Sequence, residues 1–184
     1  ILILLGVIYL ILNDWGGEQK IFLESFKNDK FSDYFKLLIL VSSIFIFFCS
    51  DQFIRDKKLS KFEYPIIIMF SILGMFFMLS ANDLILFYLG LELQSLALYV
   101  LASFDRDNTI SSEAGIKYFV LSALSSGLLL YGCSLLYGFT GSTNFDEIGV
   151  SLITQNTGAI FAMVFILVGL AFKVSAVPFH MWTP

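Results

Sequence analysis

The chain has 184 residues, of which 58% are hydrophobic and 14% are charged, and its formal net charge is −4. Soluble domains average about 45–50% apolar and about 25% charged residues. Together with a mean hydropathy of +0.84, the composition excludes a soluble globular protein and a basic nucleic-acid-binding surface. Two cysteines and a single histidine predict neither a disulfide framework nor a metal site. We expect no cofactor, because no glycine-rich phosphate loop or redox motif is present in the sequence.

Six apolar segments predict an all-α, polytopic bundle of about six transmembrane helices. They cover residues 1–13, 34–50, 64–81, 83–104, 112–138 and 155–178, with polar connections between them. The chain begins without Met inside an apolar run and stops directly after the last segment. We therefore interpret residues 1–184 as a single but partial membrane domain, or as one half of a divided protein.

The distribution of lysine and arginine predicts the orientation of the bundle. The connections at 51–63 and 105–111 hold five of these residues, whereas those on the other side hold three, all of them in the connection before residue 34. Because positive loops stay on the cytoplasmic or matrix side, we place 51–63 and 105–111 there.

Glu92 lies near the middle of the fourth apolar segment. A charge at the bilayer centre costs roughly 2.5–3.5 kcal/mol on insertion scales, so an ionisable group there indicates a proton- or ion-handling site. A purely structural carboxylate that fixes helix packing is the alternative. Glu92 also belongs to a polar stripe on one helical face, formed by Tyr88, Glu92, Ser95 and Tyr99.

Lys117 follows Glu113 by four residues at the start of the fifth segment, the spacing at which helical ion pairs form. It is a second candidate for the relay, although it could instead extend to the membrane interface as an anchor. The small residues further along this helix favour close packing against another helix over a proton path; they are Ser122, Ser125, Ser126 and Gly127.

Lys173 is preceded by twenty-five uncharged residues, so it is the most deeply placed cation of the chain. Pro178 removes a backbone donor and clashes with the carbonyl of Val174, which predicts a kink or break beside the lysine. Broken helices at membrane depth are typical of transport sites. His180 follows by seven residues and is a possible relay group, with a structural role as the alternative.

Three stretches of the chain resemble a known family: FYLGLELQSLALYVLASF, EAGIKYFVLSALSSGLLLYG and GLAFKVSAVPFHMWTP. They are similar, in order and in separation, to the antiporter-like subunit 2 of respiratory NADH:quinone oxidoreductase (complex I). The resemblance is strong over about residues 60–184. It implies a fold of two inverted five-helix repeats with a discontinuous helix at Pro178, and it places Glu92, Lys117 and Lys173 on a hydrophilic axis. The second repeat is absent from this chain.

The resemblance implies a proton-translocating subunit of an enzyme complex that itself performs no redox step. Its partners would be other membrane-arm subunits, including a chain or segment that supplies the missing half. Its location would be the mitochondrial inner membrane or the bacterial plasma membrane. Two alternatives stay open: a subunit of a multisubunit cation/proton antiporter, and a structural spacer whose buried charges only set helix register.

Overall fold

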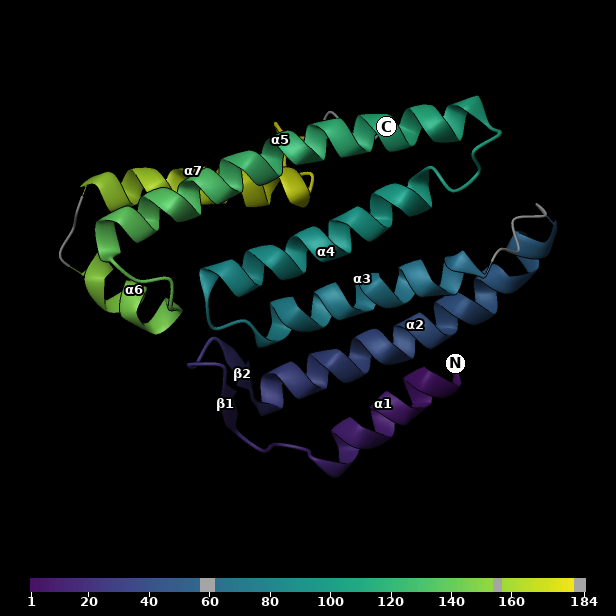
Figure 1. The fold of residues 1–184 in the computed structure, drawn as a ribbon, viewed down its shortest axis with the longest axis horizontal. Coiled ribbons are helices and arrows are strands. Elements are labelled where there is room, and N and C mark those ends of the chain that lie inside the picture. The colour runs from purple at the N-terminus through teal and green to yellow at the C-terminus, as the bar shows by residue number, and fades with distance from the viewer. Residues whose placement is uncertain (57–61, 154–156, 181–184) are drawn as a thin grey trace.

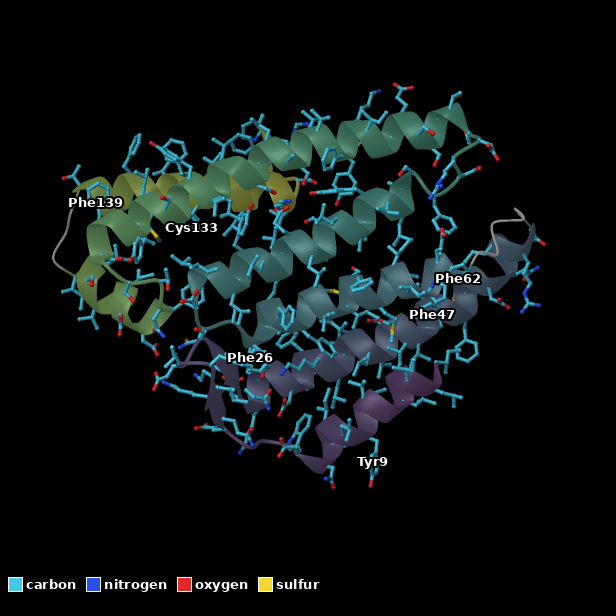
Figure 2. All side chains as sticks on the ribbon, viewed as in Figure 1. Tyr9, Phe26, Phe47, Phe62, Cys133 and Phe139 are labelled. Carbon is cyan, nitrogen blue, oxygen red and sulfur yellow. The ribbon has the colours of Figure 1, made fainter. Side chains whose placement is uncertain are left out.

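The computed structural model describes residues 1–56, 62–153 and 157–180. Over these residues helices α1 to α5 lie side by side in chain order, and α7 packs against α5 (Figure 1). The side chains that cover the outer helix faces are mostly apolar, and Tyr9 on α1 points away from the bundle (Figure 2). The elements are α1 (Leu2–Asn13), β1 (Gln19–Ile21), β2 (Phe26–Asn28), α2 (Lys30–Asp56), α3 (Glu63–Ser80), α4 (Leu84–Ala102), α5 (Thr109–Thr140), α6 (Phe145–Leu152) and α7 (Thr157–Lys173).

All six predicted apolar segments form helices, which confirms the all-α membrane fold. Among the described residues, α2, α3, α4 and α5 are long and apolar enough to cross a membrane, while α1 and α7 are shorter apolar helices. The observed helix bounds differ most from the predicted ones in two places. Helix α5 has 32 residues, about 48 Å at 1.5 Å per residue, and therefore extends beyond a bilayer core of about 30 Å. Helix α7 ends at Lys173, five residues before the predicted limit.

Two elements were not predicted from the sequence. The first is the antiparallel hairpin β1–β2, which pairs Gln19 with Asn28. Its tip places three non-glycine residues at positive φ, Phe22, Leu23 and Glu24, so it lacks the Asn-Gly or Asp-Gly signal of a tight hairpin. The second is α6, which lies in one of the predicted polar connections.

Helix α6 did have a sequence signal at its start. The side chain of Asn144 accepts a hydrogen bond from the backbone N–H of Asp146, and Asp146 and Glu147 lie in the first turn. An Asn cap followed by acidic residues is a typical helix start. The short length of the helix, eight residues, hid it among the polar residues of the connection.

Two helix pairs are packed through glycine. In the pair α3/α4, a Cβ atom added at Gly90 would lie 2.9 Å from the carbonyl oxygen of Gly74. In the pair α5/α7, a Cβ atom added at Gly132 would lie 2.8 Å from the backbone nitrogen of Ile166. These contacts let the backbones approach closely, as small residues do in membrane helices. The site described below lies where the two pairs meet.

Backbone hydrogen bonds join three connections at one end of the bundle. The N–H of Asn82 donates to Ser25 in the hairpin at 2.8 Å, and the N–H of Phe145 donates to Asn82 at 3.1 Å. The N–H of Leu84 donates to Thr143 at 2.9 Å, at the start of α4. The turn after α4 lies at the opposite end (Figure 1). The loops thus alternate between the two ends as predicted. Which end faces the cytoplasm or matrix stays a prediction, and Lys57, Lys58 and Lys61 of the positive loop lie outside the described residues.

Candidate functional site

Lys173 is the last residue of α7, and a defined turn ends the helix there. The N–H of Ala176 donates to the carbonyl of Ala171 at 2.9 Å, and the N–H of Ser175 donates to that of Phe172 at 3.1 Å. Ser175 has φ +55°. This is the Schellman arrangement, in which a left-handed residue reverses the chain and its two bonds satisfy carbonyls of the last turn. The predicted break near Pro178 is therefore confirmed, and Ser175 is the residue at which the chain reverses.

The ammonium group of Lys173 lies among four polar side chains. Its Nζ donates to Ser122 Oγ at 2.8 Å, to Tyr99 Oη at 3.2 Å and to Ser95 Oγ at 3.3 Å. It forms an ion pair with Glu92 Oε1 at 3.5 Å. The side chains of Lys173 and Glu92 are 13% and 22% exposed, so the pair is largely shielded inside the bundle.

The α4 side of this site comes from the predicted polar stripe. Glu92, Ser95 and Tyr99 follow one another at three- and four-residue spacing, which places them on one face of the helix. All three contact Lys173. Glu92 Oε1 is buried and accepts no hydrogen bond from any described residue, so the ion pair is its polar contact there. Tyr88, the first member of the stripe, is partly buried one turn before Glu92.

The α5 side of the site was missed by sequence reasoning, which assigned the serines to packing. Ser125 fits that interpretation, because its Oγ donates to the carbonyl of Gly169 on α7 at 3.0 Å. Ser122 does not, because it contacts both Lys173 and Tyr99, whose Oη donates to Ser122 Oγ at 2.5 Å. Gly127 is not a contact residue: a Cβ atom added there would meet nothing within 4 Å. Ser122 could have been found only by knowing that α7 packs against α5.

Lys117 lies apart from this arrangement, and His180 follows the end of α7. The Nζ of Lys117 pairs with Glu113 Oε1 at 2.6 Å, and the two side chains are 66% and 64% exposed. Close packing of Gly115 against Ser103 puts Lys117 near the end of α4 rather than at the level of Glu92. His180 is exposed and follows the turn after α7, outside a helix. The structure therefore brings together Glu92 and Lys173, and places Lys117 with Glu113.

Lys173 can hold its proton in two arrangements: paired with Glu92, or hydrogen-bonded to the neighbouring hydroxyl groups alone. A buried ammonium is stable only when it is paired or hydrogen-bonded, and Lys173 has one charged and three neutral partners. Opening the ion pair with Glu92 would leave the hydroxyl groups of Ser95, Tyr99 and Ser122 in place. A carboxylate and an amine that can pair and separate within a membrane are suited to proton transfer.

Residues 81–184 match the family model described as NADH:quinone oxidoreductase/Mrp antiporter, transmembrane. That match covers more than half of the chain and contains the whole Glu92–Lys173 site. The chain belongs to this family. It is accordingly a multi-pass membrane protein with the antiporter-like fold.

Comparisons over the full length agree with this assignment. The chain is 54% identical to NADH-quinone oxidoreductase subunit N of Pelagibacter ubique over 182 residues, which is 99% of this chain and 39% of the relative. It is 51% identical to NADH-quinone oxidoreductase subunit N 1 of Rhizobium meliloti, and the match covers 100% of this chain and 38% of the relative. A structure of respiratory complex I from Thermus thermophilus with bound aureothin matches at a TM-score of 0.82 and 31% identity, covering 98% of this chain and 39% of that one. The chain thus spans about two fifths of the length of the relatives it matches.

Proposed function

We propose that this chain is part of a proton-translocating subunit of the membrane arm of respiratory NADH:quinone oxidoreductase, and that Glu92 and Lys173 relay the proton. The complex would carry out NADH oxidation and quinone reduction elsewhere. Its other membrane-arm subunits would be the partners of this chain, together with a chain or segment that supplies the second repeat. The membrane would be a bacterial plasma membrane or a mitochondrial inner membrane, and the two relatives named above are bacterial.

The observation that carries this proposal is the ion pair between Glu92 and Lys173 at the junction of two helix pairs. An opposite charge nearby favours the protonated form of a lysine, whereas burial without such a partner disfavours it. Glu92 belongs to the pair α3/α4 and Lys173 to the pair α5/α7. A small displacement of one pair against the other would therefore change the distance between the two charges, and with it the proton occupancy of Lys173.

Lys117 and His180 have secondary places in the proposal. Lys117 pairs with Glu113 at the end of the bundle near the turn after α4, where the two could exchange protons with water or with a neighbouring subunit. His180 follows Lys173 beyond the end of α7 and would continue the relay toward the second repeat. Both roles are predictions, and an interfacial anchor for Lys117 and a structural role for His180 are the alternatives.

The two other candidate functions share the same residues. The family description includes the Mrp antiporter, so a cation/proton antiporter subunit stays a candidate. The relatives at 54% and 51% identity are named as subunits of NADH-quinone oxidoreductase, which favours the complex I assignment. A structural spacer would need the ion pair only for assembly.

The experiment that tests the proposal compares Glu92→Gln with Glu147→Gln in the assembled complex, reconstituted in vesicles. Glutamine keeps the size of the side chain but cannot titrate. We expect Glu92→Gln to assemble and to lose most of its NADH-driven proton uptake. Glu147 is exposed on α6, so Glu147→Gln should pump normally. Normal pumping by Glu92→Gln would refute the relay. Poor assembly of Glu92→Gln, with normal pumping by the fraction that does assemble, would favour the spacer.

A further inference from the structure

The hydroxyl groups around Lys173 are connected to one another as well as to the ammonium. Tyr99 Oη donates to Ser122 Oγ, and Ser122 Oγ is the shortest polar contact of Lys173 Nζ, at 2.8 Å. Both hydroxyls are deeply buried: Tyr99 is 5% exposed and Ser122 is 3% exposed. The ion pair with Glu92 does not require either of them. Besides stabilising the ammonium, Tyr99 and Ser122 thus form a hydrogen-bonded path that ends at Lys173 Nζ.

From this geometry we propose that Tyr99 and Ser122 form a two-hydroxyl proton wire that reloads Lys173 after it has released its proton. The inference rests on the function proposed above for Lys173. It adds two residues that contact the reacting nitrogen, and it assigns them the delivery of the proton rather than the pairing of the charge.

The hydrogen-bonded contacts allow delivery toward the lysine. Once Lys173 is neutral, its amine has a lone pair and accepts a hydrogen bond from the nearest hydroxyl, that of Ser122. The order is then Tyr99 O–H to Ser122 oxygen, and Ser122 O–H to Lys173 nitrogen. A proton from water binds at Tyr99 Oη, the tyrosine proton moves to Ser122 Oγ, and the serine proton moves to Nζ. One proton enters and one N–H bond forms, so both hydroxyls are restored.

The position of Tyr99 indicates the end from which the proton arrives. Tyr99 lies in the last turn of α4, close to the turn at residues 103–108, whereas Glu92 lies two turns deeper. A cavity of about 260 Å³ opens beside this last turn, lined by Glu63, Ile67, Val100, Ser103, Phe104 and Arg106. Ser103 Oγ, in the wall of this cavity, donates to the backbone carbonyl of Tyr99 at 3.1 Å. Water in this cavity would supply protons from the end predicted to face the cytoplasm or matrix.

The order of the two hydroxyls in this path makes a quantitative prediction. Tyr99 receives the proton first, and its Oη also lies 3.2 Å from Lys173 Nζ, so Ser122→Ala leaves a longer direct contact to the lysine. Ser122→Ala should therefore lose less pumping, whereas Tyr99→Phe and the double variant should lose the same, larger amount. We expect proton pumping to fall roughly 100-fold, the lower end of what a positioned proton-transfer group contributes. If each hydroxyl instead solvates the ammonium independently, the two losses multiply in the double variant.

The variants are chosen to preserve the packing. Tyr99→Phe retains the ring that contacts Tyr118 and Phe119, with centroids 4.7 and 5.6 Å apart. Ser122→Thr retains a hydroxyl and should restore most of the pumping lost in Ser122→Ala. Ser126→Ala is the matched control, because Ser126 is a buried serine one turn later whose Oγ donates to the carbonyl of Ser122. It should pump normally.

The outcomes separate this inference from the proposed function. Equal losses in Tyr99→Phe and the double variant, with a smaller loss in Ser122→Ala that Ser122→Thr rescues, support the wire. Full pumping by Tyr99→Phe and Ser122→Ala, or losses that multiply, overturns it and leaves the Glu92–Lys173 relay intact. If Ser122→Ala fails to assemble, Tyr99→Phe decides alone, and full pumping by that variant overturns the wire. Normal pumping by Glu92→Gln would instead overturn the proposed function itself.

Discussion

The Nζ atom of Lys173 lies 3.5 Å from Oε1 of Glu92, although Lys173 ends the broken helix α7 and Glu92 lies in the middle of the unbroken helix α4. The two residues reach each other because α7 stops partway along α5 (Figure 1). Neither charge would be stable alone in a bilayer. The pair, its three neighbouring hydroxyls and the helix break therefore form one functional unit.

The close approach of α3 and α4 should be necessary for this unit. In Gly90→Ala the new methyl group would lie 2.8 Å from the backbone nitrogen of Met78 and 2.9 Å from the carbonyl of Gly74, and backbone atoms cannot move aside cheaply. We expect a loss of about 1–3 kcal/mol in the free energy of unfolding. Pumping should fall as well, because Glu92 lies half a turn later. Thermal inactivation of the assembled complex measures the first effect.

Gly127→Ala is the control for that substitution. It makes the same chemical change in a helix, but the added methyl group meets nothing within 4 Å. Alanine is a better helix former by about 1 kcal/mol, so this variant should be as stable as the native chain or more stable. Equal destabilisation by the two variants would show that the glycine contact between α3 and α4 is unimportant.

The stability of the folded chain should depend on pH through the cap at the start of α2. Asp29 Oδ1 accepts the N–H of Ser32 at 2.8 Å, and Ser32 Oγ accepts the N–H of Asp29 at 3.0 Å, a reciprocal cap. The backbone hydrogen bond from Ser32 lowers the pKa of Asp29 below its ordinary value, and the nearby charge of Lys27 contributes in the same direction. A lowered pKa means that the stabilisation is present above the unfolded-state value, about 3.9, and is lost as the pH falls through the folded-state value.

Asp29→Asn tests this dependence, because asparagine caps helices equally well but does not titrate. The melting temperature of Asp29→Asn should fall less than that of the native chain between pH 5 and pH 3. Asp29→Ala should cost about 1 kcal/mol at neutral pH. Parallel acid profiles for the native chain and Asp29→Asn would contradict the assignment.

The fold could be predicted from the sequence to the extent that burial in lipid determines it. Long apolar runs separated by charges locate the helices, because the bilayer requires every backbone group to be satisfied within a helix. Glu92 and Lys173 could be found for the same reason, since an isolated charge in an apolar run is conspicuous. The hairpin at residues 19–28 could not be found, because its tip uses Phe22, Leu23 and Glu24 at positive φ without the usual turn residues.

The remaining part of the site depends on contacts between distant segments. Serine is common at packed membrane-helix faces, so Ser122 and Ser125 look alike in sequence. They differ because one faces the end of α7 and the other faces Gly169 within it. Likewise, the i, i+4 spacing predicted the pairing of Lys117 with Glu113, but not that the pair would lie on the surface of the bundle.

The orientation of the bundle can be tested by labelling. Cysteines would be introduced at Asp107, in the turn after α4, and at Glu147, on α6, after Cys49 and Cys133 have been replaced by serine. Both positions are exposed and lie at opposite ends. A membrane-impermeant maleimide should reach the Asp107→Cys position from the cytoplasmic or matrix side and the Glu147→Cys position from the other side. Labelling of both from the same side would contradict the alternation of the loops.

The central claim is that Lys173 carries a proton and is more than a fixed positive charge. Lys173→Arg tests it most directly, because arginine keeps the charge opposite Glu92 but does not release a proton in proteins. The measurement is the number of protons pumped per NADH oxidised by the assembled complex in sealed vesicles, with Lys173→Met as the uncharged comparison. We predict that both variants assemble and that both show a reduced ratio. A native ratio in Lys173→Arg together with a reduced ratio in Lys173→Met would show that Lys173 is a fixed charge and contradict the relay.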